Sequence, residues 1–260
     1  VTYGKAYGTL PTNIKLSGFT FSGWFTAASG GRQVRATDTA DGSDGSTLYA
    51  QWHKTSHQIC GNITCSEASH KVVTWTPWNG SSSIAYNTNK VAYVYLTTDI
   101  TSKSYFDIGK GYTLYLCLNG KSLSSSHSTQ TIQNRGTLVI CDCGGTGRLV
   151  NTGAGGRVVY NYPDSSASMT MYSGTLESTG ANGTTVDNGF GASMTLYGGT
   201  VRSTGAGGTV VQNSDTFTMH NGTLENTGVE NKNNGKDTHG LITNGTATIY
   251  GGSIKCTNGY

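Results

Sequence analysis

Residues 167–180 read A-S-M-T-M-Y-S-G-T-L-E-S-T-G, and the chain returns to this pattern three more times. The copies are A-S-M-T-L-Y-G-G-T-V-R-S-T-G at 192–205, T-F-T-M-H-N-G-T-L-E-N-T-G at 216–228 and T-A-T-I-Y-G-G-S-I-K-C-T-N-G at 246–259. The central glycine of each copy (Gly174, Gly199, Gly222 and Gly252) recurs after 25, 23 and 30 residues. Such a period, with short apolar segments between glycines, is typical of a coil that stacks on its neighbours.

A second pattern has the same period but lies in another part of the coil. An apolar residue precedes an asparagine by two positions at Ile132/Asn134, Val159/Asn161, Val186/Asn188, Val211/Asn213 and Ile242/Asn244. We expect these asparagines to be buried and to stack their amides from coil to coil at about 4.8 Å, the spacing of β-strands. The two patterns together predict an all-β chain that contains a right-handed, single-stranded parallel β-helix.

Alternation along each strand separates the inner from the outer side chains. We expect the inward residues to be Met169, Met171, Met194, Leu196, Phe217, Met219, Ala247 and Ile249, and in the next strand Leu176, Val201, Leu224 and Ile254. Threonines form an outward column at 170, 195, 218 and 248. A second column alternates in charge (Glu177, Arg202, Glu225 and Lys255), which predicts pairing between neighbouring coils.

The composition agrees with this architecture and excludes several classes of protein. Of 260 residues, 38 are glycine and only 12% are charged, whereas helical proteins are rich in Ala, Leu, Glu and Lys. The net charge of +3 is too small for a nucleic-acid groove, so no nucleic-acid partner is expected. No apolar run reaches the roughly 20 residues of a membrane span, so no membrane insertion is expected.

Residues 1–53 differ from the repeats and contain two aromatic motifs. These are S-G-F-T-F-S-G-W-F-T-A-A-S-G-G at 17–31 and S-T-L-Y-A-Q-W at 46–52. They closely resemble the B-repeat of internalins, also called the Listeria–Bacteroides repeat, a β-grasp-like module of bacterial surface proteins. The resemblance implies a secreted or cell-surface bacterial protein, and it carries over no catalytic residues. The first strand and Gly-Gly turn of the family are absent, so we expect the module to be truncated at its N-terminus.

The chain is therefore expected to have three parts. Residues 1–53 form the B-repeat-like module, residues 54–89 form a junction that leads into the β-helix, and residues 90–260 form the β-helix itself. We expect the β-helix to continue beyond residue 260, because its last coil carries no polar cap.

The junction contains H-Q-I-C-G-N-I-T-C-S-E-A-S-H at residues 57–70. His57, Cys60, Cys65 and His70 match the ligand set of a closed tetrahedral zinc site, which would be structural because no position is left for water. A Cys60–Cys65 disulfide, natural in an oxidising extracellular setting, and free thiols are the alternatives.

Cysteines inside the repeats are a separate matter. Cys117 and Cys141 are 24 residues apart and share one repeat position, so they should stack at about 4.8 Å, within the range that a disulfide permits. Cys143 and Cys256 have no partner that the period predicts.

Four ring-bearing residues share the position that follows the first strand of each repeat: Tyr172, Tyr197, His220 and Tyr250. Exposed aromatic rows stack on sugar rings, and nearby Ser, Thr and Asn side chains bond to hydroxyl groups. The alternative is a stack of rings that only stiffens the coil. We expect the chain to recognise a host surface protein or a glycan from an extracellular or cell-surface position.

An enzyme is the alternative function, because parallel β-helices of the pectin-lyase-like class include polysaccharide lyases and glycoside hydrolases. Those sites need two or three acids gathered on one outer face, or acids with a basic residue. Here Glu177 and Glu225 belong to the charge column. Asp187 lies in a column otherwise made of uncharged residues: Gln133, Tyr160, Gln212 and Thr243. The nearest approach to a catalytic pair is Asp237 and His239 in D-T-H-G. A lone D-x-H is a weak signal, and a hydrogen bond within the loop explains it equally simply. We therefore expect no catalytic residues in this chain.

Overall fold

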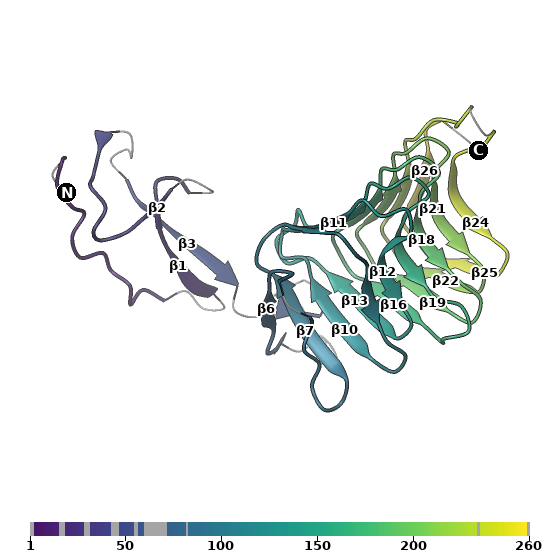
Figure 1. The fold of residues 1–260 in the computed structure, drawn as a ribbon, viewed down its shortest axis with the longest axis horizontal. Coiled ribbons are helices and arrows are strands. Elements are labelled where there is room, and N and C mark those ends of the chain that lie inside the picture. The colour runs from purple at the N-terminus through teal and green to yellow at the C-terminus, as the bar shows by residue number, and fades with distance from the viewer. Residues whose placement is uncertain are drawn as a thin grey trace. The chain divides into compact units, whose positions relative to one another are not determined.

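The computed structural model describes residues 3–15, 19–28, 32–42, 47–54, 57–59, 72–81, 83–232 and 235–258. The chain forms two compact units, Val1–Ser56 and His57–Tyr260. Over the described residues every regular element is a β-strand, which confirms the predicted all-β class (Figure 1). The described residues contain no helix of the length and apolar character needed to span a membrane.

The first unit contains a three-stranded antiparallel sheet in the order β2-β1-β3. Its strands are β1 (Phe19–Phe25), β2 (Gln33–Val34) and β3 (Tyr49–Lys54). The ring of Phe21 meets those of Trp24 and Trp52 edge to face, with centroids 5.7 and 5.4 Å apart. The Trp24 indole also donates a 2.8 Å hydrogen bond to the carbonyl oxygen of Pro11. Aromatic residues of both motifs therefore pack together on this small sheet.

The second unit begins with a short antiparallel pair, β4 (His57–Gln58) and β5 (Val72–Val73), and continues as a solenoid of three parallel sheets. The first sheet contains β6 (Thr76–Trp78), β7 (Val91–Leu96), β10 (Thr113–Cys117), β13 (Thr137–Cys141), β16 (Ser168–Met171), β19 (Ser193–Leu196), β22 (Thr216–Met219) and β25 (Thr246–Ile249). The second contains β8 (Ile100–Ser102), β11 (Ser122–Ser125), β14 (Arg148–Asn151), β17 (Thr175–Ser178), β20 (Thr200–Ser203), β23 (Thr223–Asn226) and β26 (Ser253–Cys256). The third contains β9 (Phe106–Ile108), β12 (Gln130–Asn134), β15 (Arg157–Asn161), β18 (Thr184–Asn188), β21 (Thr209–Asn213) and β24 (His239–Thr243).

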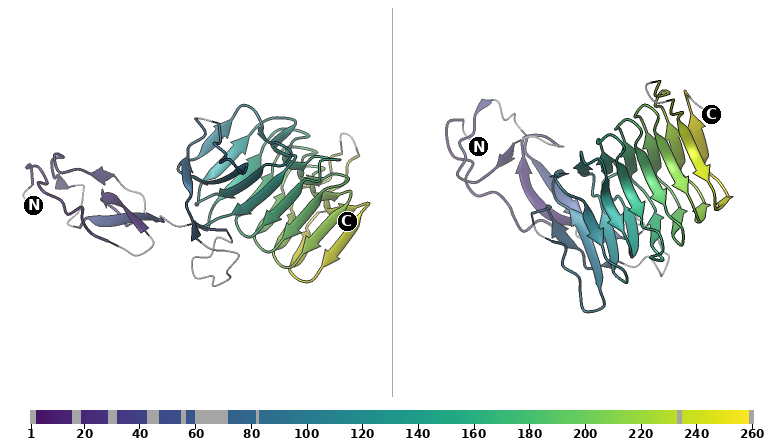
Figure 2. Two further views of the ribbon diagram at one scale, coloured as in Figure 1. Left: turned by 90° about the horizontal axis from the view of Figure 1, so that it is seen from below. Right: turned by 45° about the vertical axis from the view of Figure 1, so that its right-hand side comes forward.

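Each complete coil of the solenoid gives one strand to each sheet, and each strand inside a sheet pairs in parallel with its counterparts one coil before and after. Figure 2 shows this succession from blue through green to yellow along the stack. The predicted inward residues form the core: Met169, Met171, Met194, Leu196, Phe217, Met219, Leu176, Val201 and Leu224 are all at most 1% exposed. The parallel β-solenoid is thus confirmed, and its interior is filled by the side chains that alternation selects.

The last coil differs from the prediction. Ile249 and Ile254 are 48% and 43% exposed, and Ala247 is only half-buried. β25 and β26 stand at the ends of their sheets in this structure, so each has a neighbouring strand on one side only. Burial in a solenoid needs a coil on both sides, which explains why correctly oriented apolar residues remain exposed here.

Buried asparagines stack along the third sheet as expected. The amide of Asn134 donates to the side-chain oxygen of Asn161 at 2.9 Å, Asn161 donates to Asn188 at 2.9 Å, and Asn188 donates to Asn213 at 2.7 Å. These four side chains are fully buried, so the ladder satisfies polar groups that water cannot reach.

The fifth member of this ladder is Thr243, and the assignment of Asn244 was wrong by one residue. Asn213 pairs with Thr243 in the register and donates to its hydroxyl at 2.9 Å. The same shift places Ile242, rather than Thr243, in the outer column that contains Asp187. Asn244 is exposed.

The second sheet contains another buried polar column, which the sequence pattern did not indicate. Its members follow one another in register: Ser125, Asn151, Ser178, Ser203 and Asn226. All are at most 1% exposed. The S-T-G or N-T-G ending of the first three copies, at 178–180, 203–205 and 226–228, was the available signal for it.

A column of glycines brings successive coils into close contact at the turn after the second sheet. A Cβ atom added to Gly180, Gly205 or Gly228 would lie 2.0, 2.1 or 2.2 Å from the glycine carbonyl oxygen of the preceding coil. No side chain fits at that distance, and the recurring T-G of the repeat therefore reflects close backbone approach rather than flexibility.

Candidate functional site

The four residues of the predicted ring column form one continuous stack beside the first sheet. We call this set the ring ladder; it consists of Tyr172, Tyr197, His220 and Tyr250, each following strand β16, β19, β22 or β25. Successive ring centroids are 5.1, 4.6 and 5.1 Å apart, and the planes are within 9°, 2° and 14° of parallel. The register of the strands imposes this arrangement, because equivalent residues of neighbouring coils lie directly above one another.

Stacking determines which parts of these rings a ligand can reach. Each inner ring has both faces covered by its neighbours, whereas its edge, with a hydroxyl or an imidazole nitrogen, is open to solvent at Tyr197 (45% exposed) and His220. Tyr250, the last ring, is 71% exposed and has one uncovered face. The ladder therefore offers a row of polar ring edges and a single open aromatic face.

Hydroxyl-bearing side chains run parallel to the ring ladder on the same outer surface. Thr170, Thr195, Thr218 and Thr248 are in register with one another, and so are Ser168, Ser193, Thr216 and Thr246. All eight are partly or fully exposed. Together with the ring edges they form a flat, regularly spaced surface of hydrogen-bonding groups with no charged side chain among its twelve members.

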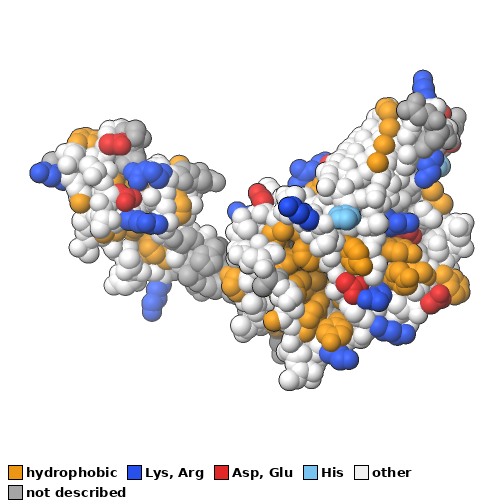
Figure 3. All heavy atoms as spheres, viewed as in Figure 1, with side chains coloured by type: hydrophobic (Ala, Val, Ile, Leu, Met, Phe, Trp, Pro, Cys, Tyr) orange, Lys and Arg blue, Asp and Glu red, His pale blue; other side chains and the backbone are white. Residues whose placement is uncertain are grey.

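Figure 3 shows charged side chains scattered over the face of the solenoid that is turned toward the reader. Acidic and basic side chains lie there among hydrophobic and uncharged ones, and in places red adjoins blue. The contacts of each carboxylate therefore indicate whether it has a structural role or is available for catalysis.

Four carboxylates of the solenoid are engaged in structural contacts. The buried carboxylate of Glu177 contacts Arg202 at 2.8 Å and also contacts Arg148. Arg157 binds Asp187 at 2.7 Å, and Arg135 binds Asp107. Asp142 accepts backbone hydrogen bonds from Gly120, Gly144 and Gly147 at 2.7, 3.1 and 2.7 Å.

The predicted alternation of charge holds in the register but not along the whole column. Glu177 pairs with Arg202, whereas no ion pair within 4 Å joins the described side chains of Glu225 and Lys255. Arg148, one coil earlier, supplies the second cation to Glu177 instead. This contact crosses from one strand position to another, so the simple column of the sequence did not predict it.

Asp237 and His239 lie where the long turn enters β24. The Asp237 side chain is exposed and the His239 side chain is half-buried, and no hydrogen bond between these two side chains occurs in the structure. The backbone of His239 accepts from the amide of Asn226 at 2.9 Å and donates to Gly208 at 3.1 Å. The backbone of His239 therefore anchors the end of this turn.

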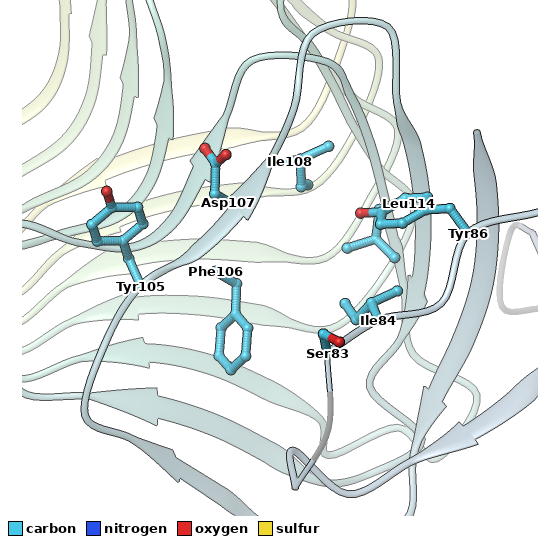
Figure 4. A pocket seen from close by; sticks show the side chains of 8 residues that line it. All are labelled: Ser83, Ile84, Tyr86, Tyr105, Phe106, Asp107, Ile108 and Leu114. Atoms are coloured by element: carbon cyan, nitrogen blue, oxygen red, sulfur yellow. The ribbon is translucent and has the colours of Figure 1, made fainter.

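A cavity of about 210 Å³ opens near the start of the solenoid, lined by Ser83, Ile84, Tyr86, Tyr105, Phe106, Asp107, Ile108 and Leu114 (Figure 4). The oxygen atoms of Tyr105 and Asp107 point to the same side in Figure 4, away from the ring of Phe106. Burial, followed by the nearby Asp107 and Tyr112, raises the pKa of Tyr86 to about 12, so its hydroxyl stays protonated. The cavity is smaller than typical small-molecule sites, and its carboxylate is held by Arg135.

The ring ladder continues toward the N-terminus as a pair of cysteines. Cys141 lies one coil before Tyr172, at the equivalent position of β13. Cys117 is in register with Cys141, and Tyr95 is in register with Cys117. The predicted stacking of Cys117 on Cys141 is therefore confirmed. The column as a whole runs Tyr95, Cys117, Cys141, Tyr172, Tyr197, His220 and Tyr250.

Cys143 joins these two cysteines, a contact that the period could not predict. The sulfur atoms of Cys117, Cys141 and Cys143 all lie within 4.8 Å of one another, and the three side chains are buried. We call these three residues the thiol cluster. Such a set could hold a metal ion.

Aromatic side chains cover the thiol cluster. Trp75 is buried against it, and Val73, Tyr93, Tyr95, Tyr115 and Tyr172 pack around it. The Cys141 thiol lowers the pKa of Cys117 by hydrogen bonding, but hydrogen bonding to Cys143 and burial outweigh this effect and raise that pKa to about 12. Hydrogen bonds to Cys117 and Cys143, and then burial, raise the pKa of Cys141. At neutral pH the thiols of Cys117 and Cys141 are therefore protonated when no metal is bound.

The predicted zinc ligands cannot be placed. Cys60, Cys65 and His70 lie outside the described residues, and of His57 only the backbone, in β4, is described.

Comparison with known proteins identifies the first part of the chain only. Residues 1–51 match the Listeria-Bacteroides repeat domain family, which confirms that part of the predicted resemblance. This repeat domain is typical of bacterial surface proteins. Neither the curated proteins nor the solved structures include a significant match to this chain.

Proposed function

We propose that this chain belongs to a secreted or cell-surface bacterial protein and that its solenoid serves adhesion, recognising a host surface protein or a glycan. The Listeria–Bacteroides repeat at residues 1–51 supports the location. The ring ladder carries the proposal of recognition, because its rings are ordered by stacking and three of them, Tyr197, His220 and Tyr250, are exposed.

The chemistry of the ladder favours a ligand that is itself rich in hydroxyl groups. Tyrosine hydroxyls and the imidazole both donate and accept hydrogen bonds, and the adjacent Ser and Thr columns do the same. A glycan chain lying across the ring edges would meet such groups at every coil, about 4.8 Å apart. The open face of Tyr250 adds one position where a sugar ring can stack.

Binding to a glycan array tests this proposal when the parent chain is compared with the double variant Tyr172→Ala/Tyr197→Ala. Two tyrosines that contact a ligand each contribute about 1–2 kcal/mol, so we expect the double variant to bind at least about tenfold more weakly. Phe190→Ala is the matched control, because Phe190 is 67% exposed on the same solenoid and lies outside the ladder.

Circular dichroism of the variants separates loss of binding from loss of fold, since removing stacked rings also costs about 0.5–1.5 kcal/mol per pair. Undiminished binding by a folded double variant would remove the ring ladder from the proposal.

A reducing-end assay on the same polysaccharides tests the enzyme alternative: turnover that Asp237→Ala or His239→Ala abolishes would replace recognition with cleavage as the function.

The proposal also retains the division into residues 1–53, 54–89 and 90–260, with a structural zinc ion bound by His57, Cys60, Cys65 and His70 in the junction. A closed site of two thiolates and two imidazoles predicts about one zinc ion per purified chain. Elemental analysis measures this ratio, and Cys60→Ser/Cys65→Ser should abolish it. A value below about 0.2 zinc per chain contradicts the zinc site and favours the disulfide or free thiols.

A further inference from the structure

We propose that the thiol cluster of Cys117, Cys141 and Cys143 is a binding site for one thiophilic metal ion, and that Cu(I) is the ion that fits it. This site is distinct from the zinc motif of the junction and from the surface that we propose for recognition. It lies outside the apolar interior of the solenoid, in a second cluster beneath Trp75.

The fold brings the three sulfur atoms together by two different means. Strand register stacks Cys117 on Cys141, and the turn that follows β13 returns the chain so that Cys143 faces both. Three atoms within 4.8 Å of one another enclose a point no more than about 2.8 Å from each. A metal–sulfur bond is about 2.3 Å long, so a contraction of about half an ångström closes the site.

The turn itself is held rigidly, which fixes the third sulfur. Asp142, between the two cysteines of C-D-C, accepts hydrogen bonds from the backbone of Gly120, Gly144 and Gly147. Gly144 packs so closely on Gly120 that an added Cβ would lie 2.3 Å from the Gly120 nitrogen. The position of Cys143 is therefore set by the backbone and not by the sulfur contacts alone.

The donor set identifies the class of metal. Among the described residues, the group of possible ligands contains three cysteines and no histidine or carboxylate. Both oxygens of the neighbouring Asp142 are engaged by backbone amides. Thiolate ligands select Cu(I), zinc or iron–sulfur clusters. Structural zinc and iron–sulfur clusters are typically held by four protein ligands, so a set of three thiolates favours Cu(I), which takes fewer ligands.

The surroundings are suited to a soft ion and exclude water. Trp75 covers the cluster, and rings of Tyr95 and Tyr172 lie before and after the cysteines in the same column. Each thiol that coordinates the ion loses its proton to solvent as its sulfur–metal bond forms, and the oxidation state of copper and sulfur does not change.

Titration of the reduced full chain with Cu(I), under anaerobic conditions and against a chromophoric Cu(I) chelator, tests this inference. The background is Cys60→Ser/Cys65→Ser, so that the junction cysteines contribute nothing. We expect one equivalent of Cu(I) to bind, and adding Cys143→Ser to that background to weaken binding at least about tenfold. Cys256→Ser is the matched control and should bind as the background does, because Cys256 bonds to Thr238 away from the cluster.

X-ray absorption of the copper-loaded background protein counts the ligands independently of any variant that fails to fold. Three sulfur neighbours per copper are the expected result. Two outcomes would overturn the proposal: no competition with the chelator, or a copper environment with fewer than three sulfur atoms. Equally tight binding by a folded Cys143→Ser variant would overturn it as well. Failure of glycan binding leaves this inference untouched, because the copper titration replaces only cysteines and keeps Tyr172, the one residue that belongs to the ring ladder and also packs against the thiol cluster.

Discussion

Replacing Phe217 by alanine should lower the free energy of unfolding by about 3–5 kcal/mol, the range for removing a fully buried aromatic side chain. Phe217 is the largest fully buried side chain of the solenoid, and it stacks in register between Met194 and Ala247. The coils on either side are tied to their neighbours by backbone hydrogen bonds, so they cannot collapse into the cavity. Urea denaturation followed by circular dichroism measures the loss.

Phe190→Ala is the control for this measurement. The same side chain is removed, but Phe190 is 67% exposed, so we expect a change within about 0.5 kcal/mol. Similar losses for the two variants would mean that Phe217 does not lie in the core, and the assignment of inward and outward faces would be wrong.

Asn188→Ala should cost about 2–4 kcal/mol, because it breaks the middle of the buried asparagine ladder. The Asn188 amide donates to the side chain of Asn213 at 2.7 Å and to the carbonyl oxygen of Thr216 at 3.0 Å. Its side-chain oxygen accepts from Asn161 at 2.9 Å. Alanine leaves those acceptors buried without their donor, and each such group costs about 1–3 kcal/mol.

Asn89→Ala provides the comparison, since Asn89 is exposed in a turn before β7 and should change stability by less than about 0.5 kcal/mol. Hydrogen exchange adds a local readout: amides of β15, β18 and β21 should lose protection in Asn188→Ala before those of β7 and β10. Equal stability of the two variants would show that the buried asparagine ladder is not required for the stability of the solenoid.

Much of the solenoid could be predicted because its period imposes the same environment on equivalent residues. Met194 and Leu196 are buried for the reason that Met169 and Met171 are, and a single alignment of the repeats therefore assigned the core. The error at Asn244 has a physical origin. The insertion at 228–236 lengthens the turn before β24, and matching by residue type then selected an asparagine. The structure uses Thr243, whose hydroxyl also accepts the bond from Asn213.

The candidate sites could be predicted only in part from the sequence, because they depend on side-chain torsions and turn geometry that do not follow the repeat. The column of rings was predictable, but whether neighbouring rings stack on their faces depends on side-chain torsions. Cys117 and Cys141 follow from the repeat, whereas Cys143 belongs to a turn whose path is set by Asp142 and close glycine contacts. Trp75 packs against the thiol cluster, but it lies outside the repeats, so the period could not predict this contact.

Substitution of the ladder hydroxyls alone gives the sharpest test of recognition. Tyr197 and Tyr250 are 45% and 71% exposed. Tyr197→Phe/Tyr250→Phe keeps the stacked rings and removes only their exposed hydroxyls, so it should leave the midpoint of urea denaturation unchanged. On the glycan array, we predict that this variant binds at least about fivefold more weakly than the parent chain, because each lost hydrogen bond contributes about 0.5–1.5 kcal/mol and leaves a ligand hydroxyl without its partner. Equal binding by the parent chain and this folded variant would contradict the proposal that the ring ladder recognises its ligand through the ring edges.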